Sequence, residues 1–311
     1  MTNPNKRFAT LALVLVASCA TSTQRSFETG VAKVLVSPEQ ENQIGLQLKN
    51  ELDTKEGVVY LNDPTVVDYV RATANNVIQF GKKERPEVSW QVFVIDDSKT
   101  VNAFATPGGY LYVYRGLLET AQNEAELAAV MAHETGHVVA RHAARSLITA
   151  YGIDAVASLA AGSNPGLLTK IATNVAGQGL LLTHSRADET EADEFGARYA
   201  SAAGYDPHAF STFFQRLQKE EGNTPAVLSY LSDHPATGDR ITHINQYIQA
   251  NNLGGTNLNA DAYQRMRKRL ASLPPSPAKK GAAAAPAGAP PGAPPPGAPP
   301  GAPPPGAPPS H

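Results

Sequence analysis

Residues Asn123 to Arg145 read NEAELAAVMAHETGHVVARHAAR. Asn123 is a preferred N-cap residue, and Glu126, three positions later, can complete a capping box. Apolar residues then recur at helical spacing, which predicts an amphipathic helix with one buried face. On such a helix His133 and His137 lie one turn apart, within roughly 40° of each other around the axis. Two imidazoles in this arrangement can bind one ion.

Glu134 follows the first of these histidines and lies about 60° from His137 around the helix axis. Its carboxylate can reach a water molecule on the ion without being a ligand itself. This pattern is the HExxH arrangement of zinc peptidases. Because HExxH occurs by chance in roughly one chain in a hundred of this size, a zinc site requires a third ligand elsewhere.

The composition narrows the class of protein. The chain has 311 residues, of which 42% are hydrophobic, and a formal net charge of −2. This length allows one large domain or two. The small net charge and the lack of a basic stripe argue against a nucleic-acid partner.

Residues 1–18 have the features of an export signal, with basic residues before an apolar run too short to span a bilayer. The sequence VASC at 16–19 resembles a bacterial lipobox, and Cys19 is the single cysteine, so it has no partner for an internal disulfide. We therefore expect a lipidated Cys19, a linker over 19–36 and anchoring at the periplasmic face of a bacterial membrane. Ala20, the residue that follows this cysteine, favours sorting of the lipoprotein to the outer membrane. The alternative is a signal peptide that ends near a cysteine by chance.

Residues 271–311 are rich in proline, alanine and glycine and contain sixteen of the 25 prolines. This composition cannot bury enough apolar surface to form a core, and the glycine spacing misses the period of three that collagen requires. We expect a disordered tail of polyproline type. It could contact the cell wall or another envelope component, or it could serve only for solubility.

The residues between these ends, 37–270, are predicted to form one α+β domain that is mostly helical. Capping residues and glycine stops mark the helices, and alternation of apolar and polar residues marks the strands. The predicted helices cover 37–53, 63–81, two short stretches or a mobile flap within 151–183, and 185–203; the predicted strands cover 88–95, 101–106 and 110–114.

Asn102, Ala103 and Phe104 lie in the second strand of the small predicted sheet, which directly precedes the metal helix. An extended substrate can pair with the edge of a sheet, backbone to backbone. We therefore assign substrate binding to these residues. The alternative is an ordinary hairpin that covers the helix.

A second predicted helix offers the third ligand. Glu189 and Asp193 are four residues apart and share one face, whereas Glu191 points about 200° away from Glu189. Glu189 is then the ligand, and Asp193 would orient a ligand imidazole through its other nitrogen. On physical grounds alone Asp193 and Glu191 could equally be solvated charges. His142 is nine residues after His133, about 180° around a continuous helix, so we expect it on the helix face without a metal role.

His234, within SDHP at 232–235, is the strongest further candidate for chemistry. It could donate a hydrogen bond to the transition state, or act as a fourth ligand that blocks the site until substrate displaces it. Arg240 could shape the same pocket and bind substrate. For both residues the alternative is a loop that caps the following helix. Three further histidines are expected at the surface: His184, His208 and His243.

The chain resembles the HtpX and CAAX prenyl protease family of zinc metallopeptidases in HETGHVVARH at 133–142, SRADETEADEFGARYA at 185–200, VNAFATPGGYLYVYRGLL at 101–118 and HP at 234–235. The soluble periplasmic branch of BepA, LoiP and Oma-type enzymes is the more similar one. The resemblance covers roughly residues 37–250. It implies a gluzincin-like fold and endopeptidase activity on proteins. It also implies that Glu189 and Asp193 form the family's ExxxD motif.

The sequence departs from relatives in two respects. It lacks the transmembrane helices of the HtpX and prenyl protease branches, so a prenylated substrate is not expected, and it shows no TPR-like repeat after residue 250. We predict one Zn²⁺ per chain, held by His133, His137 and Glu189, with Glu134 as general base. The expected function is an endopeptidase that cleaves unfolded or misassembled envelope proteins. The rival is an envelope chaperone or assembly factor with a structural or latent zinc site.

Overall fold

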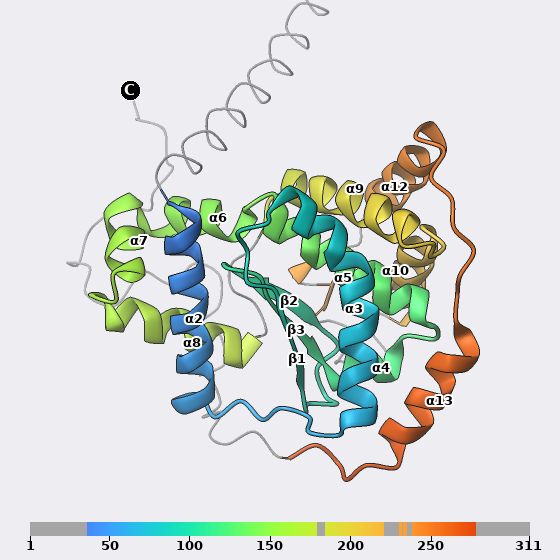
Figure 1. Ribbon diagram of the computed structural model, residues 1–311, viewed down its shortest axis with the longest axis horizontal. Helices are drawn as coiled ribbons and strands as arrows, with labels where there is room; N and C mark the ends of the chain where they lie inside the picture. Colours follow the sequence, from blue (N-terminus) through green and yellow to red (C-terminus); the bar gives the residue numbers. More distant parts are fainter. Residues whose placement is uncertain (1–35, 179–183, 221–229, 232, 235–237, 278–311) are drawn as a thin grey trace, which may run out of the picture. The chain divides into compact units, whose positions relative to one another are not determined.

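The computed structural model describes residues 36–178, 184–220, 230–231, 233–234 and 238–277. The expected signal peptide, Cys19, the linker up to residue 35 and the tail from residue 278 lie outside these ranges. No described helix is long and apolar enough to cross a membrane. The elements (Figure 1) are α2 (Pro38–Thr54), α3 (Pro64–Glu84), β1 (Gln91–Ile95), β2 (Ala103–Thr106), β3 (Tyr110–Tyr114), α4 (Arg115–Thr120), α5 (Glu124–Val139), α6 (His142–Tyr151), α7 (Ile153–Ala160), α8 (Pro165–Gln178), α9 (Arg186–Ala202), α10 (Ala209–Glu220), α12 (Gly238–Ala250) and α13 (Ala260–Ala271).

The three strands form one sheet in the order β1-β3-β2, in which β1 is parallel and β2 antiparallel to β3. Every residue of β3 is buried, because helices cover both faces of the sheet. Tyr110 and Tyr112 pack into a core with α2, α7 and α8, whereas Leu111 and Val113 pack into a core with α3 and α5. Figure 1 shows these two groups of helices on either side of the sheet. The prediction of a mostly helical α+β fold with a small sheet is confirmed.

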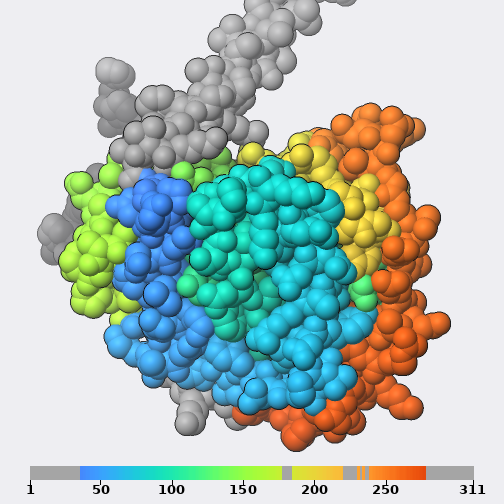
Figure 2. All heavy atoms as spheres, in the orientation of Figure 1, coloured from blue at the N-terminus to red at the C-terminus, as the bar shows by residue number. Residues whose placement is uncertain are grey.

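Local signals placed most helix starts correctly. The capping box at Ser37 begins α2, and Asp63 caps α3. The expected stop at Gly81 is wrong, since α3 continues to Glu84. A Cβ atom at Gly81 would lie 2.6 Å from Cγ2 of Thr135 in α5. This glycine therefore permits a close contact between α3 and α5 and does not end the helix. In Figure 2, α2 (blue) and α3 (cyan) lie on one face of the molecule.

Residues that follow α13 make hydrogen bonds with residues at the end of the sheet. Arg115, which is buried, donates a 2.8 Å hydrogen bond to the carbonyl of Pro274, and the Ser276 hydroxyl donates to Asp96 Oδ1 at 2.9 Å. Pro274 and Ser276, which lie in the predicted tail, therefore contact residues that follow β1 and β3. The composition of this segment does not predict these contacts, because their partners, Arg115 and Asp96, are far away in the sequence.

Candidate metal centre

Helix α5 buries His133, Glu134 and His137, with exposed fractions of 0%, 2% and 3%. The Nε2 atoms of the two histidines lie 3.0 Å apart. The spacing of one helical turn therefore brings both imidazoles to one point, as the sequence predicts.

Helix α9 packs unusually close to α5 across two glycines. A Cβ atom at Gly136 would lie 2.7 Å from Cβ of Phe195, and a Cβ atom at Gly196 would lie 3.2 Å from the backbone nitrogen of His133. The two helices can approach this closely because these residues have no side chain. The capping box of Ser185 and Asp188 fixes the start of α9, so that Glu189 in its first turn reaches the histidines.

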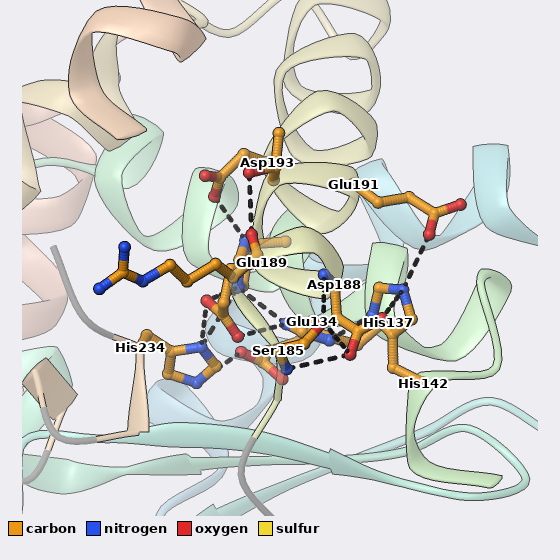
Figure 3. A network of polar contacts seen from close by, with 12 residues as sticks. Glu134, His137, His142, Ser185, Asp188, Glu189, Glu191, Asp193 and His234 are labelled. Atoms are coloured by element: carbon orange, nitrogen blue, oxygen red, sulfur yellow. Dashed lines mark hydrogen bonds and ion pairs between the residues drawn. The ribbon is translucent and has the colours of Figure 1, made fainter. Parts of the chain in front are cut away.

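Four side chains converge at this point: His133, His137, Glu189 and His234. Glu189 Oε2 is 3.6 Å from His133 Nε2, and Glu189 Oε1 is 3.5 Å from His137 Nε2. His234 Nδ1 is 3.3 Å from His133 Nε2 and 3.1 Å from Glu189 Oε2. Figure 3 shows Glu189 and His234 pointing toward each other from α9 and from the segment before α12.

This donor set fits a tetrahedral zinc ion. Zinc holds nitrogen and carboxylate oxygen at about 2.0–2.2 Å, which in a tetrahedron places ligand atoms about 3.3–3.6 Å from one another. The separations given above for the four side chains span 3.0–3.6 Å. Within the described part of the chain, Glu189 Oε1 is also buried without a hydrogen-bond partner, as expected of an oxygen reserved for a metal.

The electrostatics favour a cation at the same point. Burial, together with His184 and His133, holds the pKa of His137 well below its usual value, so its imidazole is neutral and able to bind metal. Burial opposes ionisation of Glu189, but the charge of His234 and hydrogen bonds from His133 and His234 outweigh it and lower the pKa of Glu189. Burial also opposes the charge of His133, yet Asp193 and Glu189 outweigh it and raise the pKa of His133 to about 9.

We expect zinc affinity to rise with pH. With a pKa of about 9, His133 is protonated in the metal-free chain at neutral pH. Zinc requires the neutral imidazole, so apparent affinity should rise about tenfold per pH unit between pH 6 and 8 and level off above the pKa. Competition with a chelator of known affinity at each pH measures this profile. A flat profile would show that zinc displaces no proton from His133.

The second nitrogen of His133 faces a carboxylate. Its Nδ1 lies 3.0 Å from Asp193 Oδ1, and Arg240 grips both oxygens of Asp193, with Nε at 2.9 Å and Nη2 at 2.7 Å. Arg240 Nη1 also lies 2.9 Å from Glu189 Oε2. The position expected for Asp193 agrees with this geometry. Arg240 is only 6% exposed and directs its guanidinium at these two acids, so the geometry does not favour the substrate contact assigned to it.

The position expected for His142, on the face of a continuous helix, is wrong, because the helix does not continue through it. α5 ends at Val139, and Arg141 adopts a left-handed conformation with φ 62°, which starts α6 in a new direction. His142 is completely buried, and its Nδ1 lies 2.7 Å from Nδ1 of His137. The calculation of 180° assumed one straight helix.

His184, which was expected at the surface, is half-buried and lies beside the donor set. Its ring stacks on that of His137 at a centroid distance of 4.1 Å. It also lines a cavity of about 530 Å³ beside Glu189 and Arg240, between α9 and α12. His208 is exposed and His243 is 41% exposed, as expected.

The expected edge strand exists: β2 pairs with β3 alone among the described strands. Ala105 and Thr106 share a small crevice with His137, so this strand ends beside the donor set. Ala103 and Phe104 are buried as whole residues, backbone included, and the amide of Ala103 already donates to Asn102 Oδ1 at 2.8 Å. The Asn102 side chain is buried and donates to Asp233 Oδ2 at 2.6 Å, next to His234.

Glu134 lies beside the donor set without belonging to it. Its Oε1 is 3.5 Å from His234 Nε2. Burial raises the pKa of Glu134, although the charges of His234 and His133 counteract this effect. A buried carboxylate with a raised pKa can both accept and return a proton near neutral pH.

Comparison with known proteins gives a consistent assignment. Residues 64–248 match the model of peptidase family M48. The chain is 39% identical over 164 residues to the mitochondrial metalloendopeptidase OMA1 of Schizosaccharomyces pombe, covering 52% of this chain and 48% of that protein. It is 35% identical over 194 residues to the putative beta-barrel assembly-enhancing protease of Vibrio cholerae, covering 58% and 39%. It is 29% identical over 214 residues to the metalloprotease LoiP of Escherichia coli, covering 67% and 80%.

The matched regions thus span less than half of the first two relatives. The relatives agree with the BepA, LoiP and Oma branch that the sequence resembles. The family model spans more than half of the chain and includes the HExxH helix, Glu189 and His234. This chain therefore belongs to peptidase family M48.

Proposed function

We propose that the protein is a zinc-dependent endopeptidase with a gluzincin-like site. The observation that carries this proposal is a buried carboxylate, Glu134, placed next to a four-donor set but outside it. A purely structural zinc site needs ligands but no such neighbour. Membership of a peptidase family supports the same reading.

In this proposal His133, His137 and Glu189 hold the ion, and Asp193 orients His133. When bound, zinc lowers the pKa of a coordinated water and polarises the scissile carbonyl. Glu134 accepts the proton of the attacking water and delivers it to the leaving amine. Substrate would lie extended along β2, whose least buried residue is Ala105, and pair with its outer backbone edge.

His234 fills the fourth donor position, so we propose that it blocks the site until substrate displaces it. Its Nδ1 points at the donors and its Nε2 at Glu134, so the ring lies between the donor set and the proposed base. A latent site of this kind also suits the rival chaperone function.

We expect His234→Ala to raise cleavage of unfolded casein while zinc stays near one per chain. If the closed arrangement outweighs the open one by about tenfold, the gain approaches tenfold. Initial rates with metal analysis test this. Slower cleavage at full zinc content would instead assign His234 a hydrogen bond to the transition state.

The proposed substrates are unfolded or misassembled proteins of the cell envelope. Support comes from the relatives that are named as beta-barrel assembly-enhancing proteases. The direct test is cleavage of casein by the purified protein, its loss with a zinc chelator and its return with added Zn²⁺. Suppression of aggregation without cleavage, in wild type and His234→Ala alike, would favour the chaperone.

We also propose a lipid anchor at Cys19 on the periplasmic face of the outer membrane. Support comes from the lipobox-like sequence VASC at 16–19. In cells, Cys19→Ser should release the protein from the membrane fraction and alter its gel mobility; unchanged fractionation contradicts the anchor. Contact of the tail with the cell wall is tested in the same way by deletion of residues 278–311.

A further inference from the structure

His133 and His137, the two proposed ligand histidines, each use one ring nitrogen for the donor set, and their other nitrogens face different kinds of side chain. His133 faces the carboxylate of Asp193, whereas His137 faces another imidazole, that of His142, with 2.7 Å between the two Nδ1 atoms. Both rings of the latter pair are buried. A contact this short between two ring nitrogens requires one to carry a proton and the other to lack it.

The donor geometry selects one arrangement of protons. His137 directs Nε2 at the donor set, so its proton must reside on Nδ1 when a metal is bound. His142 Nδ1 must then accept that proton in a hydrogen bond, which leaves the proton of His142 on Nε2. This Nε2 lies 3.2 Å from Glu191 Oε2 and 3.6 Å from Asp188 Oδ1. Each hydrogen bond therefore has one donor and one acceptor.

The two acids at the outer end of this series of hydrogen bonds are also held in place. Arg145 Nη2 lies 2.6 Å from Asp188 Oδ1 and 3.6 Å from Glu191 Oε2, so an arginine balances the two acids. Figure 3 shows Glu191, His142 and His137 in this succession. The cluster of His142, Asp188 and Glu191 is thus a hydrogen-bonded support and not a cation site of its own, because Arg145 already supplies the positive charge.

The fold holds His142 in place through the break between α5 and α6. Arg141, the left-handed residue at this break, donates from Nε to Glu41 Oε1 at 2.8 Å. Glu41 also accepts from Arg85 at 2.7 Å, and all three side chains are buried. A left-handed non-glycine residue is unfavourable and persists only where its surroundings enforce it. Here the result is that His142 turns back toward His137.

We propose that His142 is a positioning residue that fixes the tautomer and ring orientation of His137, with Glu191 and Asp188 behind it. The proposal rests on the proposed zinc site. In this proposal α9 supports both ligand histidines. Asp193 contacts His133 directly, whereas Glu191 and Asp188 act on His137 through His142.

The test compares two buried amides at the same position in the full chain. His142→Asn places an amide oxygen near Nδ1 and keeps the acceptor for His137, whereas His142→Gln places its amide near Nε2 and loses that acceptor. Loss of an outer-shell partner typically weakens metal affinity 10–100-fold. We expect zinc affinity, measured by chelator competition, to fall about 10–100-fold in His142→Gln and to stay within about threefold of wild type in His142→Asn.

Two further measurements complete the experiment. The visible spectrum of the Co²⁺-substituted protein should change in His142→Gln and match wild type in His142→Asn. His208→Asn, at an exposed histidine, is the matched control and should bind zinc like wild type. Equal affinities in the Gln and Asn variants, or a weaker Asn variant, would overturn the proposal.

Failure of the role proposed for His142 can be distinguished from failure of the proposed peptidase function. Tight zinc binding without protein cleavage, in wild type and His234→Ala alike, would refute the peptidase and leave the affinity comparison valid. Wild type that binds no zinc would refute both.

Discussion

Glu134→Gln is expected to lower kcat/KM for unfolded casein by about 10²–10⁴-fold, the usual contribution of a general base. Glutamine has almost the same shape as glutamate but cannot accept the proton of the attacking water. Because Glu134 lies outside the donor set, zinc content should remain near one per chain.

The measurement is casein turnover together with metal analysis of the same preparation. Glu124→Gln is the matched control, because Glu124 is also a buried acid on α5 but accepts hydrogen bonds from Tyr205 and Asn259, away from the donors. This control should keep wild-type turnover. Loss of zinc from Glu134→Gln would place its carboxylate in the coordination shell, and undiminished turnover would require a different base.

The sequence predicts those features of the site that depend on residues close together in the chain. The convergence of His133 and His137 follows from one helical turn, and the N-caps at Ser37 and Ser185 follow from side chains three residues from their partners. The common face of Glu189 and Asp193 is equally local. All of these features are present in the structure.

The helix break at Arg141 has no local signal. The stretch VVARH at 138–142 contains neither glycine nor proline, so periodicity continues the helix through it. The break depends on Glu41, a hundred residues earlier in the chain. The consequence is that the role of His142 could not be deduced from spacing.

Glycines show the same limit. Gly136 lies inside the motif and Gly81 near the predicted end of a helix. Both glycines permit a close contact between two helices, which their positions in the sequence do not reveal. Likewise, the distance of His234 from Glu189 depends on how α9, α10 and α12 pack. A histidine followed by proline identifies a candidate, and only the fold places its ring 3.1 Å from a ligand oxygen.

Glu189→Gln is expected to remove zinc binding at micromolar metal and, with it, all measurable cleavage. Loss of an outer-shell partner costs 10–100-fold in metal affinity, and loss of the anionic ligand itself should exceed that range. The substitution also removes a negative charge that His133 and Arg240 share in a buried site. Both effects oppose retention of a divalent ion.

The control for Glu189→Gln is Glu194→Gln on the same helix, where the acid is 36% exposed and pairs with His243. It should bind zinc and cleave casein like wild type, since exposed ion pairs contribute about 0–1 kcal/mol. Excess zinc should restore part of the activity of Glu189→Gln but none of the activity of Glu134→Gln, because the first variant lacks metal and the second lacks a base. Full zinc content in Glu189→Gln at equal metal concentration would show that His234 or another side chain supplies the third ligand.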